Sequence, residues 1–176
     1  MILETPISDE TIAGLTAGQT VRLSGTVYTA RDAAHKRMVE MLRRGEEPPF
    51  PFAGQVVFYA GPCPSPPGRV IGSIGPTTSG RMDAYAPELI RCGLKVMIGK
   101  GSRSAEVVEA IREYGGVYFA AVGGAAALMS RCVKSAEVVA FDDLGTEAVR
   151  RLTVERLPLI VALDSSGNCV YTAPCQ

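Results

Sequence analysis

The second half of the chain alternates amphipathic segments with short apolar ones, and glycines separate them. From Thr77 onward the expected order is helix, strand, helix, strand, at residues 82–92, 94–98, 104–114 and 117–122. Gly93 ends the first of these helices, and the pair Gly115 and Gly116 ends the second. This order is typical of βαβ units, so the sequence predicts an α/β fold.

The rest of the chain predicts further strands and short helices. Helices are expected at residues 8–15, 32–44 and 123–131, and strands at 20–29, 55–60, 70–74, 136–141, 159–163 and 169–172, the last two joined by the turn DSSGN. The first third is therefore β-rich, and the sheet is expected to be mixed. No internal repeat or low-complexity tract divides the chain, so we expect a single domain over residues 1–176.

The charge balance and hydrophobicity exclude several classes of protein. Lysine plus arginine number 18, as do aspartate plus glutamate, which excludes a strongly basic nucleic-acid-binding protein. At 47% hydrophobic and 20% charged residues the composition is globular. No apolar run approaches the roughly 20 residues of a membrane helix, and the segment MILETPISDE lacks the basic start of a signal peptide. We expect a cytoplasmic protein without a membrane partner.

The cysteines and the one histidine do not form a metal-binding pattern. Five cysteines occur without a CxxC pair, and His35 is distant in sequence from all of them. Cys63 and Cys175 could be mistaken for ligands, but small hydrophobic side chains in a reducing compartment explain the set. We expect no metal ligand in this chain, so that another chain would supply any metal that the protein needs.

The densest polar cluster is the segment GPTTSGRMD, between a predicted strand and a predicted helix. Thr77, Thr78 and Ser79 can cap the helix, and the free N–H groups of a helix start favour an anion there. Arg81 adds a planar pair of donors that suits a carboxylate. From the spacing alone, an ordinary capped helix with an exposed arginine is favoured over a ligand site.

A second candidate is the segment IGKGSR, which places Lys100 between two glycines on a turn after a strand. The segment matches neither the Walker pattern nor the dinucleotide fingerprint, because the required glycine spacings are missing. A solvated lysine is the interpretation that the spacing favours.

The third candidate is the segment YTARDAAH, where a strand gives way to a helix. Arg31 lies in the first helical turn, where the helix dipole disfavours a cation, so an anionic partner is expected. Asp32 is the simplest candidate for that partner. His35 either shares the face of Arg31 or forms a supporting hydrogen bond without a catalytic role, and the spacing does not decide between these roles.

Two further features limit the possible chemistry. The segment VGGAAA at residues 122–127 predicts a close backbone approach, to a neighbouring helix more readily than to a ligand. One histidine and the absence of a GxSxG motif argue against a serine-hydrolase triad.

These segments together resemble a known family. The stretches LSGTVYTARDAAHKR, YAGPCPSPPG, IGSIGPTTSGRMD, MIGKG, GGVYFAAVGGAAAL, DLGTEAV and LPLIVALDSSGN run nearly from end to end of the chain. They resemble the β subunit, or C-terminal domain, of the iron-sulfur class I fumarase and L-tartrate dehydratase hydro-lyases. The combination of GPTTSGRMD, TARDAAH and IGKG at these separations is highly specific.

The resemblance implies a swivelling β/β/α domain that is active only with a partner. A 4Fe-4S cluster held by cysteines of the α subunit would bind a dicarboxylate substrate, and the two subunits would form a hetero-oligomer, with a homodimer as the state of the isolated chain. Thr77 would be the catalytic proton-transfer residue, and Arg31, Arg81 and Lys100 would bind the substrate carboxylates. Asp32, His35 and Thr78 would support these residues.

The implied reaction is the reversible hydration of fumarate to L-malate. L-tartrate dehydration to oxaloacetate is the alternative within the family, because nothing in the residues separates the two substrates. A stand-alone dicarboxylate-binding module is the alternative from a different class.

Overall fold

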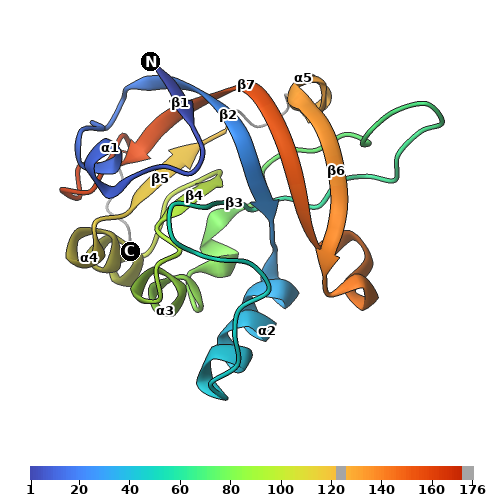
Figure 1. Ribbon diagram of the computed structural model, residues 1–176. Helices are drawn as coiled ribbons and strands as arrows, with labels where there is room; N and C mark the ends of the chain where they lie inside the picture. Colours follow the sequence, from blue (N-terminus) through green and yellow to red (C-terminus); the bar gives the residue numbers. More distant parts are fainter. Residues whose placement is uncertain (122–125, 172–176) are drawn as a thin grey trace.

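The computed structural model describes residues 1–121 and 126–171, which form strands, α-helices and two short 3-10 helices (Figure 1). The strands are β1 (Ile2–Glu4), β2 (Thr20–Thr29), β3 (Val56–Phe58), β4 (Val96–Gly99), β5 (Val117–Ala120), β6 (Val133–Ala140) and β7 (Val149–Leu163). The α-helices are α1 (Asp9–Ala13), α2 (Asp32–Arg43), α3 (Ala86–Arg91), α4 (Ala105–Tyr114) and α5 (Ala126–Cys132), and the 3-10 helices are η1 (Ser79–Met82) and η2 (Asp142–Glu147).

The strands form one mixed sheet that closes on itself. β2, β3, β4 and β5 run parallel to one another in that order. β7 lies antiparallel to β5 and also to β2, and so completes a ring. β1 pairs with β2 at the margin of the ring, and β6 pairs with β7. The predicted α/β class with a mixed sheet is confirmed.

Alternate residues of the parallel strands face two separate cores. Val56 and Phe58 of β3 belong to a cluster with residues from every strand of the ring, which fills the ring's interior. Val57, with Met97 and Tyr118 on the neighbouring strands, belongs to a second cluster shared with α2, α3 and α4 on the outside. Burial on both faces explains why these strands read as continuous apolar runs in the sequence.

Short-range signals fix the ends of several helices. The Ser8 side chain accepts a hydrogen bond from the Thr11 N–H at the start of α1, and Ser104 does the same for the Val107 N–H at the start of α4. Three predicted helices are confirmed with ends within two residues, namely those at 8–15, 32–44 and 104–114. The predicted strands at 20–29, 55–60, 94–98, 117–122 and 136–141 are present as β2, β3, β4, β5 and β6.

The strand predicted at residues 70–74 is wrong. Residues 61–77 leave the body of the molecule after β3 and return to η1 without forming a strand (Figure 1). Prolines in this segment lack N–H donors for a sheet, and the segment folds back on itself, with the Cys63 N–H donating to the Ser73 carbonyl at 2.9 Å. Ile71 and Ile74 are buried in the ring's interior, so these apolar residues pack without joining the sheet.

The helix predicted at residues 82–92 begins only at Ala86. Pro87 lies in the first turn of α3, the position that proline tolerates in a helix, and η1 occupies the residues before it. The helix predicted at 123–131 is observed as α5, and residues 122–125, including most of the segment VGGAAA, lie outside the described residues.

The C-terminal strands also differ from the prediction. β7 begins at Val149, ten residues before the predicted start, because its first part pairs with both β2 and β6. Of the predicted partner strand at 169–172, the described residues 169–171 form one bridge, between Leu163 and Cys169, and residue 172 lies outside the described residues. The short strand β1 was not predicted.

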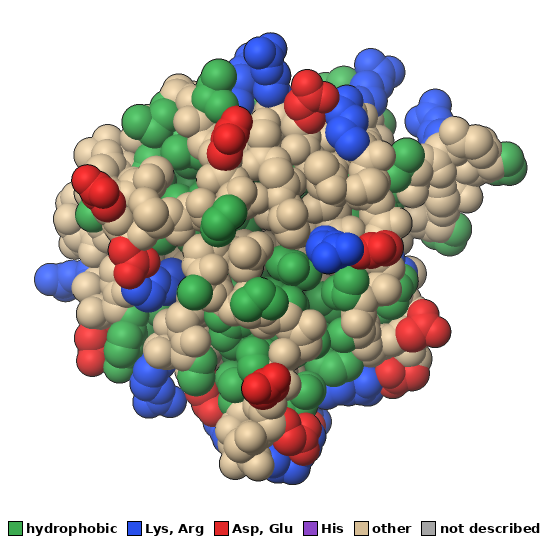
Figure 2. All heavy atoms as spheres, viewed as in Figure 1, with side chains coloured by type: hydrophobic (Ala, Val, Ile, Leu, Met, Phe, Trp, Pro, Cys, Tyr) green, Lys and Arg blue, Asp and Glu red, His purple; other side chains and the backbone are tan. Residues whose placement is uncertain are grey.

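Charged side chains are distributed over the visible face without separation by sign. Figure 2 shows acidic and basic groups interspersed between apolar ones, as the balanced composition leads one to expect. Within residues 1–121 and 126–171, no helix has the length and apolar composition needed to cross a membrane.

Candidate active site

The carboxyl ends of the parallel strands β2, β3 and β4 meet at one edge of the ring. Arg31 lies two residues beyond the end of β2, Tyr59 directly follows β3, and Lys100 directly follows β4. Ligands of α/β sheets bind outside the carboxyl ends of the strands. Residues from two of the segments singled out in the sequence therefore lie where a ligand site is expected.

The segment from Thr77 to Ser79 lies between the ends of β3 and β4. The Thr77 N–H donates to the Tyr59 carbonyl at 2.7 Å, and the Ser79 N–H donates to the Lys100 carbonyl at 2.9 Å. Thr78 and Lys100 form an isolated parallel bridge. Thr77 is half-buried, whereas Thr78 and Lys100 are exposed. The structure thus brings Thr77, Thr78 and Lys100 together through their backbones.

Ser79 anchors this segment to the sheet. Its buried hydroxyl lies 2.8 Å from the Tyr118 hydroxyl, which donates to the Gly101 carbonyl at 2.9 Å. Because the single hydroxyl hydrogen of Tyr118 is used on that carbonyl, Ser79 is the donor to Tyr118. A Cβ atom at Gly99 would lie 1.9 Å from the Ser79 Oγ, so only glycine permits this approach. Burial raises the pKa of Tyr118, which keeps its hydroxyl proton.

Arg31 occupies the N-cap position of α2 and lies along the loop that follows β3. Its Nη2 is 3.4 Å from Glu147 Oε1, and its Nε is 3.8 Å from Asp32 Oδ2. A Cβ atom at Gly61 would lie 3.2 Å from the Arg31 Cδ. The buried Nε has no hydrogen-bond acceptor among the residues that the structure describes. The Arg31 Nε is therefore a buried donor that the described residues leave unused.

Asp32 lies between Arg31 and Arg81. The Arg81 Nε donates to Asp32 Oδ1 at 2.8 Å, while the second oxygen faces Arg31. The Asp32 partner that the sequence suggested for Arg31 is present as an ion pair at 3.8 Å, while the hydrogen bond of Asp32 goes to Arg81. The Arg81 side chain is 51% exposed and that of Arg31 is 22% exposed, so Arg81 is the more open of the two cations.

His35 lies behind these residues. It is buried, its ring packs edge-on against Tyr59 at 5.1 Å, and its Nδ1 lies 2.9 Å from the Arg31 carbonyl oxygen. Because a carbonyl only accepts, Nδ1 carries the hydrogen. Burial lowers the His35 pKa to about 4, so the ring is neutral at physiological pH. This geometry supports the backbone that carries Arg31.

Comparison with known proteins places the chain in a family. Residues 1–173 match the family model described as Fumarase C-terminus. The chain belongs to this family. The family assigned from the resemblance of GPTTSGRMD, TARDAAH and IGKG is therefore confirmed.

Two kinds of relative share this family's sequence pattern. The chain is 44% identical to fumarate hydratase 1, mitochondrial, of Leishmania major and 39% identical to the aerobic class I fumarate hydratase of Escherichia coli K12; each match covers 83% of the chain. It spans only 27% of the length of each of these relatives. A Methanocaldococcus jannaschii protein with the provisional name L(+)-tartrate dehydratase subunit beta is 41% identical, over 94% of the chain and 88% of that protein.

Because His35 is buried, the free energy of unfolding of this chain is expected to depend on pH. An exposed histidine in the unfolded chain has a pKa of about 6.5, against about 4 in the fold. Between these values the unfolded state binds more protons, so the free energy of unfolding falls as the pH is lowered from about 6.5 towards 4. The loss attributable to His35 is about 3 kcal/mol.

Urea unfolding across this pH range, with wild type and His35→Gln compared, measures the effect. Carboxylates titrate in both proteins, so the difference between the two pH profiles isolates the imidazole. Parallel profiles would show that His35 does not carry this dependence.

A buried ion pair near the candidate site was not predicted from the sequence. Arg103 is 2% exposed, and its Nε donates to Asp83 Oδ1 at 2.8 Å. Asp83 Oδ2 also accepts the Ser104 N–H at 2.6 Å. Both charged residues stand at the ends of the singled-out segments GPTTSGRMD and IGKGSR, but nothing in those segments distinguishes a buried charge from an exposed one.

Glu147 was also missed. It lies in the stretch DLGTEAV, which contributed to the family resemblance without suggesting a role. Its two oxygens reach Arg31 and the N–H of Ala33, more than a hundred residues earlier in the chain. No spacing rule connects residues that are so far apart in sequence.

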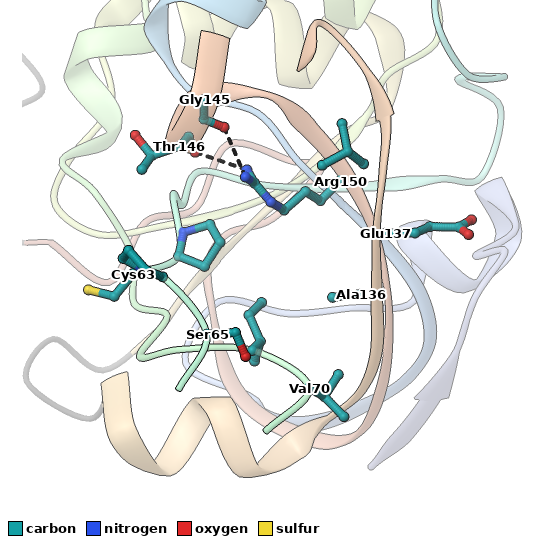
Figure 3. Close-up of a pocket in the computed structure, with 12 residues that line it drawn as sticks. Cys63, Ser65, Val70, Ala136, Glu137, Gly145, Thr146 and Arg150 are labelled. Carbon is teal, nitrogen blue, oxygen red and sulfur yellow. Dashed lines mark hydrogen bonds between the residues drawn. The ribbon is translucent and has the colours of Figure 1, made fainter. Parts of the chain in front are cut away.

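A pocket of about 410 Å³ is lined in part by Gly145 and Thr146 of η2 (Figure 3). Its lining comprises Pro62, Cys63, Pro64, Ser65, Val70, Ile71, Ala136, Glu137, Val138, Gly145, Thr146 and Arg150. Arg150 is the cation at its wall, but it donates to the carbonyls of Gly145 and Thr146. None of the site residues predicted from the sequence lines this pocket, so the candidate site is the open edge of the ring.

The described residues contain no group of three or more histidine, cysteine or acidic side chains arranged to hold a metal. Cys63 and Cys92 are exposed, Cys132 and Cys169 are half-buried, and Cys175 lies outside the described residues. The described side chains therefore do not fit an iron-sulfur cluster.

Proposed function

We propose that this chain is the β subunit of a two-subunit hydro-lyase that interconverts fumarate and L-malate. One observation carries the proposal: Arg31, Arg81, Lys100 and Thr77 lie at the carboxyl edge of the parallel strands in a chain of the Fumarase C-terminus family. The chain spans about a quarter of the length of the fumarate hydratase relatives, and we propose that a partner α subunit supplies the remainder.

The three cations suit a dicarboxylate. Adding water to a double bond next to a carboxylate builds negative charge on that carboxylate in the transition state, and fixed cationic donors stabilise that charge. Arg81 and Lys100 are open to solvent, and the Arg31 side chain is 22% exposed although its Nε is buried. The exposed parts of these three side chains are proposed to bind the substrate carboxylates.

Thr77 is proposed to transfer the proton at its Oγ1. A threonine hydroxyl is a very weak acid, so this role requires neighbouring positive charge. Lys100, whose backbone is bridged to that of Thr78, and Arg81, four residues after Thr77, are proposed to supply that charge. Asp32, His35 and Thr78 are proposed to support these groups.

The iron-sulfur cluster implied by the family resemblance is proposed to belong to the partner α subunit. The described residues of this chain do not fit such a cluster. The exposed thiols Cys63 and Cys92 fit a reducing compartment, and we propose a cytoplasmic hetero-oligomer in which residues 1–176 act as one domain.

L-tartrate dehydration is the second candidate. It is favoured by the match to the Methanocaldococcus jannaschii protein, 88% of which is covered by this chain. The same cations would bind either dicarboxylate, so both substrates are tested together.

The test is fumarate hydration by this chain co-purified anaerobically with its α subunit, with each chain alone as a control. Activity that requires both chains is the expected result. Turnover of L-tartrate without fumarate would keep the two-subunit hydro-lyase and change its substrate. Inactivity on both, with an intact cluster, would overturn the proposal and favour a dicarboxylate-binding module.

Replacing Arg31 or Arg81 with alanine should raise KM and also lower kcat, each by about tenfold or more. The physical reason is that a carboxylate clamp acts on the bound substrate and more strongly on the transition state. Steady-state kinetics of the co-purified enzyme measure both constants. Arg43→Ala on the exposed face of α2, whose partner is Glu88, is the control; unchanged kinetics in the Arg31 and Arg81 variants would remove them from the site.

A further inference from the structure

Helix α2 begins without a cap from its own N-terminal residue. The N-cap position is occupied by Arg31, whose side chain forms no capping hydrogen bond. Serine, threonine, aspartate or asparagine is the usual residue there, because their oxygens accept the free N–H groups of the first turn. A cation at this end also opposes the helix dipole. A group from elsewhere in the chain has to satisfy both the N–H groups and the charge.

Glu147, at the end of η2, provides that group. Its Oε2 accepts the Ala33 N–H at 3.0 Å, and its Oε1 lies 3.4 Å from the Arg31 Nη2. Its side chain is 23% exposed and that of Arg31 is 22% exposed, so solvent screens this pair only in part. One carboxylate thus caps the helix and holds the guanidinium that the helix start would otherwise repel.

The loop that carries Glu147 is itself fixed from its opposite side. Arg150 donates to the carbonyls of Gly145, Thr146 and Ala148, and Figure 3 shows the first two of these bonds. A Cβ atom at Gly61 would lie 2.9 Å from the Thr146 carbonyl oxygen, so the loop after β3 packs directly on this turn. Glu147 is therefore presented to Arg31 from a braced segment.

The backbone of Arg31 is fixed as well. The His35 N–H and the His35 Nδ1 both lie 2.9 Å from its carbonyl oxygen. With the backbone held by His35 and Nη2 held by Glu147, the remaining freedom of the guanidinium is small. Its Nε is left without an acceptor, on the side where Asp32 stands 3.8 Å away.

We propose that Glu147 is a positioning residue, which orients Arg31 to bind a substrate carboxylate. The inference rests on the proposed function for the identity of that carboxylate. The contacts between Glu147, Ala33 and Arg31 do not depend on it.

Two substitutions separate positioning from simple helix capping. Glu147→Gln keeps an oxygen for the Ala33 N–H but loses the charge that holds Arg31, whereas Glu147→Ala loses both. In the co-purified enzyme, KM for the dicarboxylate is expected to rise about tenfold in both variants, with kcat changed less than KM. Thermal stability should fall mainly in Glu147→Ala, because only this variant loses the cap.

Asp143→Asn is the matched control. Asp143 is an acid of the same 3-10 helix, and it forms a two-pronged ion pair at 2.8 Å with Arg37 on the outer side of α2. The variant removes one negative charge from the same segment, and KM should stay at the wild-type value. Wild-type KM in Glu147→Gln, or an equal rise in Asp143→Asn, would overturn the positioning role.

A measurement without substrate distinguishes failure of this inference from failure of the proposed function. Urea unfolding of the chain is compared for Glu147→Gln, Arg31→Gln and the double variant. Each variant changes the unfolding equilibrium constant by some factor. The factors of the two single variants, multiplied together, should be about three times the factor of the double variant. If the two substitutions act independently on stability, Glu147 and Arg31 do not interact and the positioning role is overturned. If they are coupled but the wild-type complex is inactive, only the proposed function is overturned.

Discussion

Replacing Thr77 with alanine is expected to lower kcat of the co-purified hydro-lyase by about 100-fold or more, while KM rises by less than about threefold. The hydroxyl is assigned to a proton that moves in the transition state, and it contributes little to holding the substrate. The backbone of this segment is held by other groups, since the Thr77 N–H binds the Tyr59 carbonyl and the Ser79 N–H binds the Lys100 carbonyl. The substitution therefore removes the hydroxyl without releasing the segment.

Two variants complete this experiment. Thr77→Ser keeps a hydroxyl at the same position and should recover most of the lost kcat. Thr153→Ala removes a hydroxyl from the exposed face of β7, where it accepts a hydrogen bond from Ser135, and should leave the kinetics unchanged. Wild-type kcat in Thr77→Ala would show that the proton is moved by another group.

Features set by short-range physics were predicted well from the sequence. Helices α1 and α4, which Ser8 and Ser104 cap, and the β-branched strand β2 depend on neighbours within a few residues, and the structure has these three elements at the predicted places. The strand predicted at residues 70–74 failed because its apolar residues fill the ring's interior from a proline-rich segment. The length of β7 is set by its pairing with strands far away in the sequence.

The same distinction applies to the site. Arg31, Thr77, Arg81 and Lys100 stand at junctions between predicted elements, so their positions could be inferred before the fold was known. Their partners could not. Glu147 reaches Ala33 across 114 residues, and the Ser79 hydroxyl reaches that of Tyr118 across 39. The first contact depends on the pairing of β7 with β2 and the second on the pairing of β4 with β5, and no local pattern encodes either pairing.

The buried pair of Arg103 and Asp83 is expected to give the largest effect on stability. Arg103→Gln should lower the free energy of unfolding by about 3–5 kcal/mol, because it leaves the Asp83 charge without its partner in the interior. The guanidinium also lies over the rings of Tyr118 and Tyr59, with its Cζ at 5.0 and 5.2 Å from their centroids. Burial alone would oppose the charge of Arg103, but Tyr59 and Asp83 outweigh it and raise its pKa.

Urea unfolding of the chain measures this loss, with Arg43→Gln as the control for an exposed pair. Arg43 binds Glu88 with two hydrogen bonds on the surface, so its loss should change stability far less. If Arg103→Gln does not fold, Arg103→Lys keeps the charge and should show a smaller loss. Equal stability of Arg103→Gln and Arg43→Gln would show that burial adds nothing to the pair.

The pair of Arg103 and Asp83 is also expected to affect the candidate site, because it lies next to the segments that carry the site residues. Asp83 follows the segment that carries Thr77 and Arg81, and Arg103 follows the turn that carries Lys100. Because Asp83 also accepts the Ser104 N–H at the start of α4, the pair ties both segments to one buried point. Arg103→Lys should therefore raise KM for the dicarboxylate even where the chain remains folded, and wild-type KM in that variant would confine the pair to a structural role.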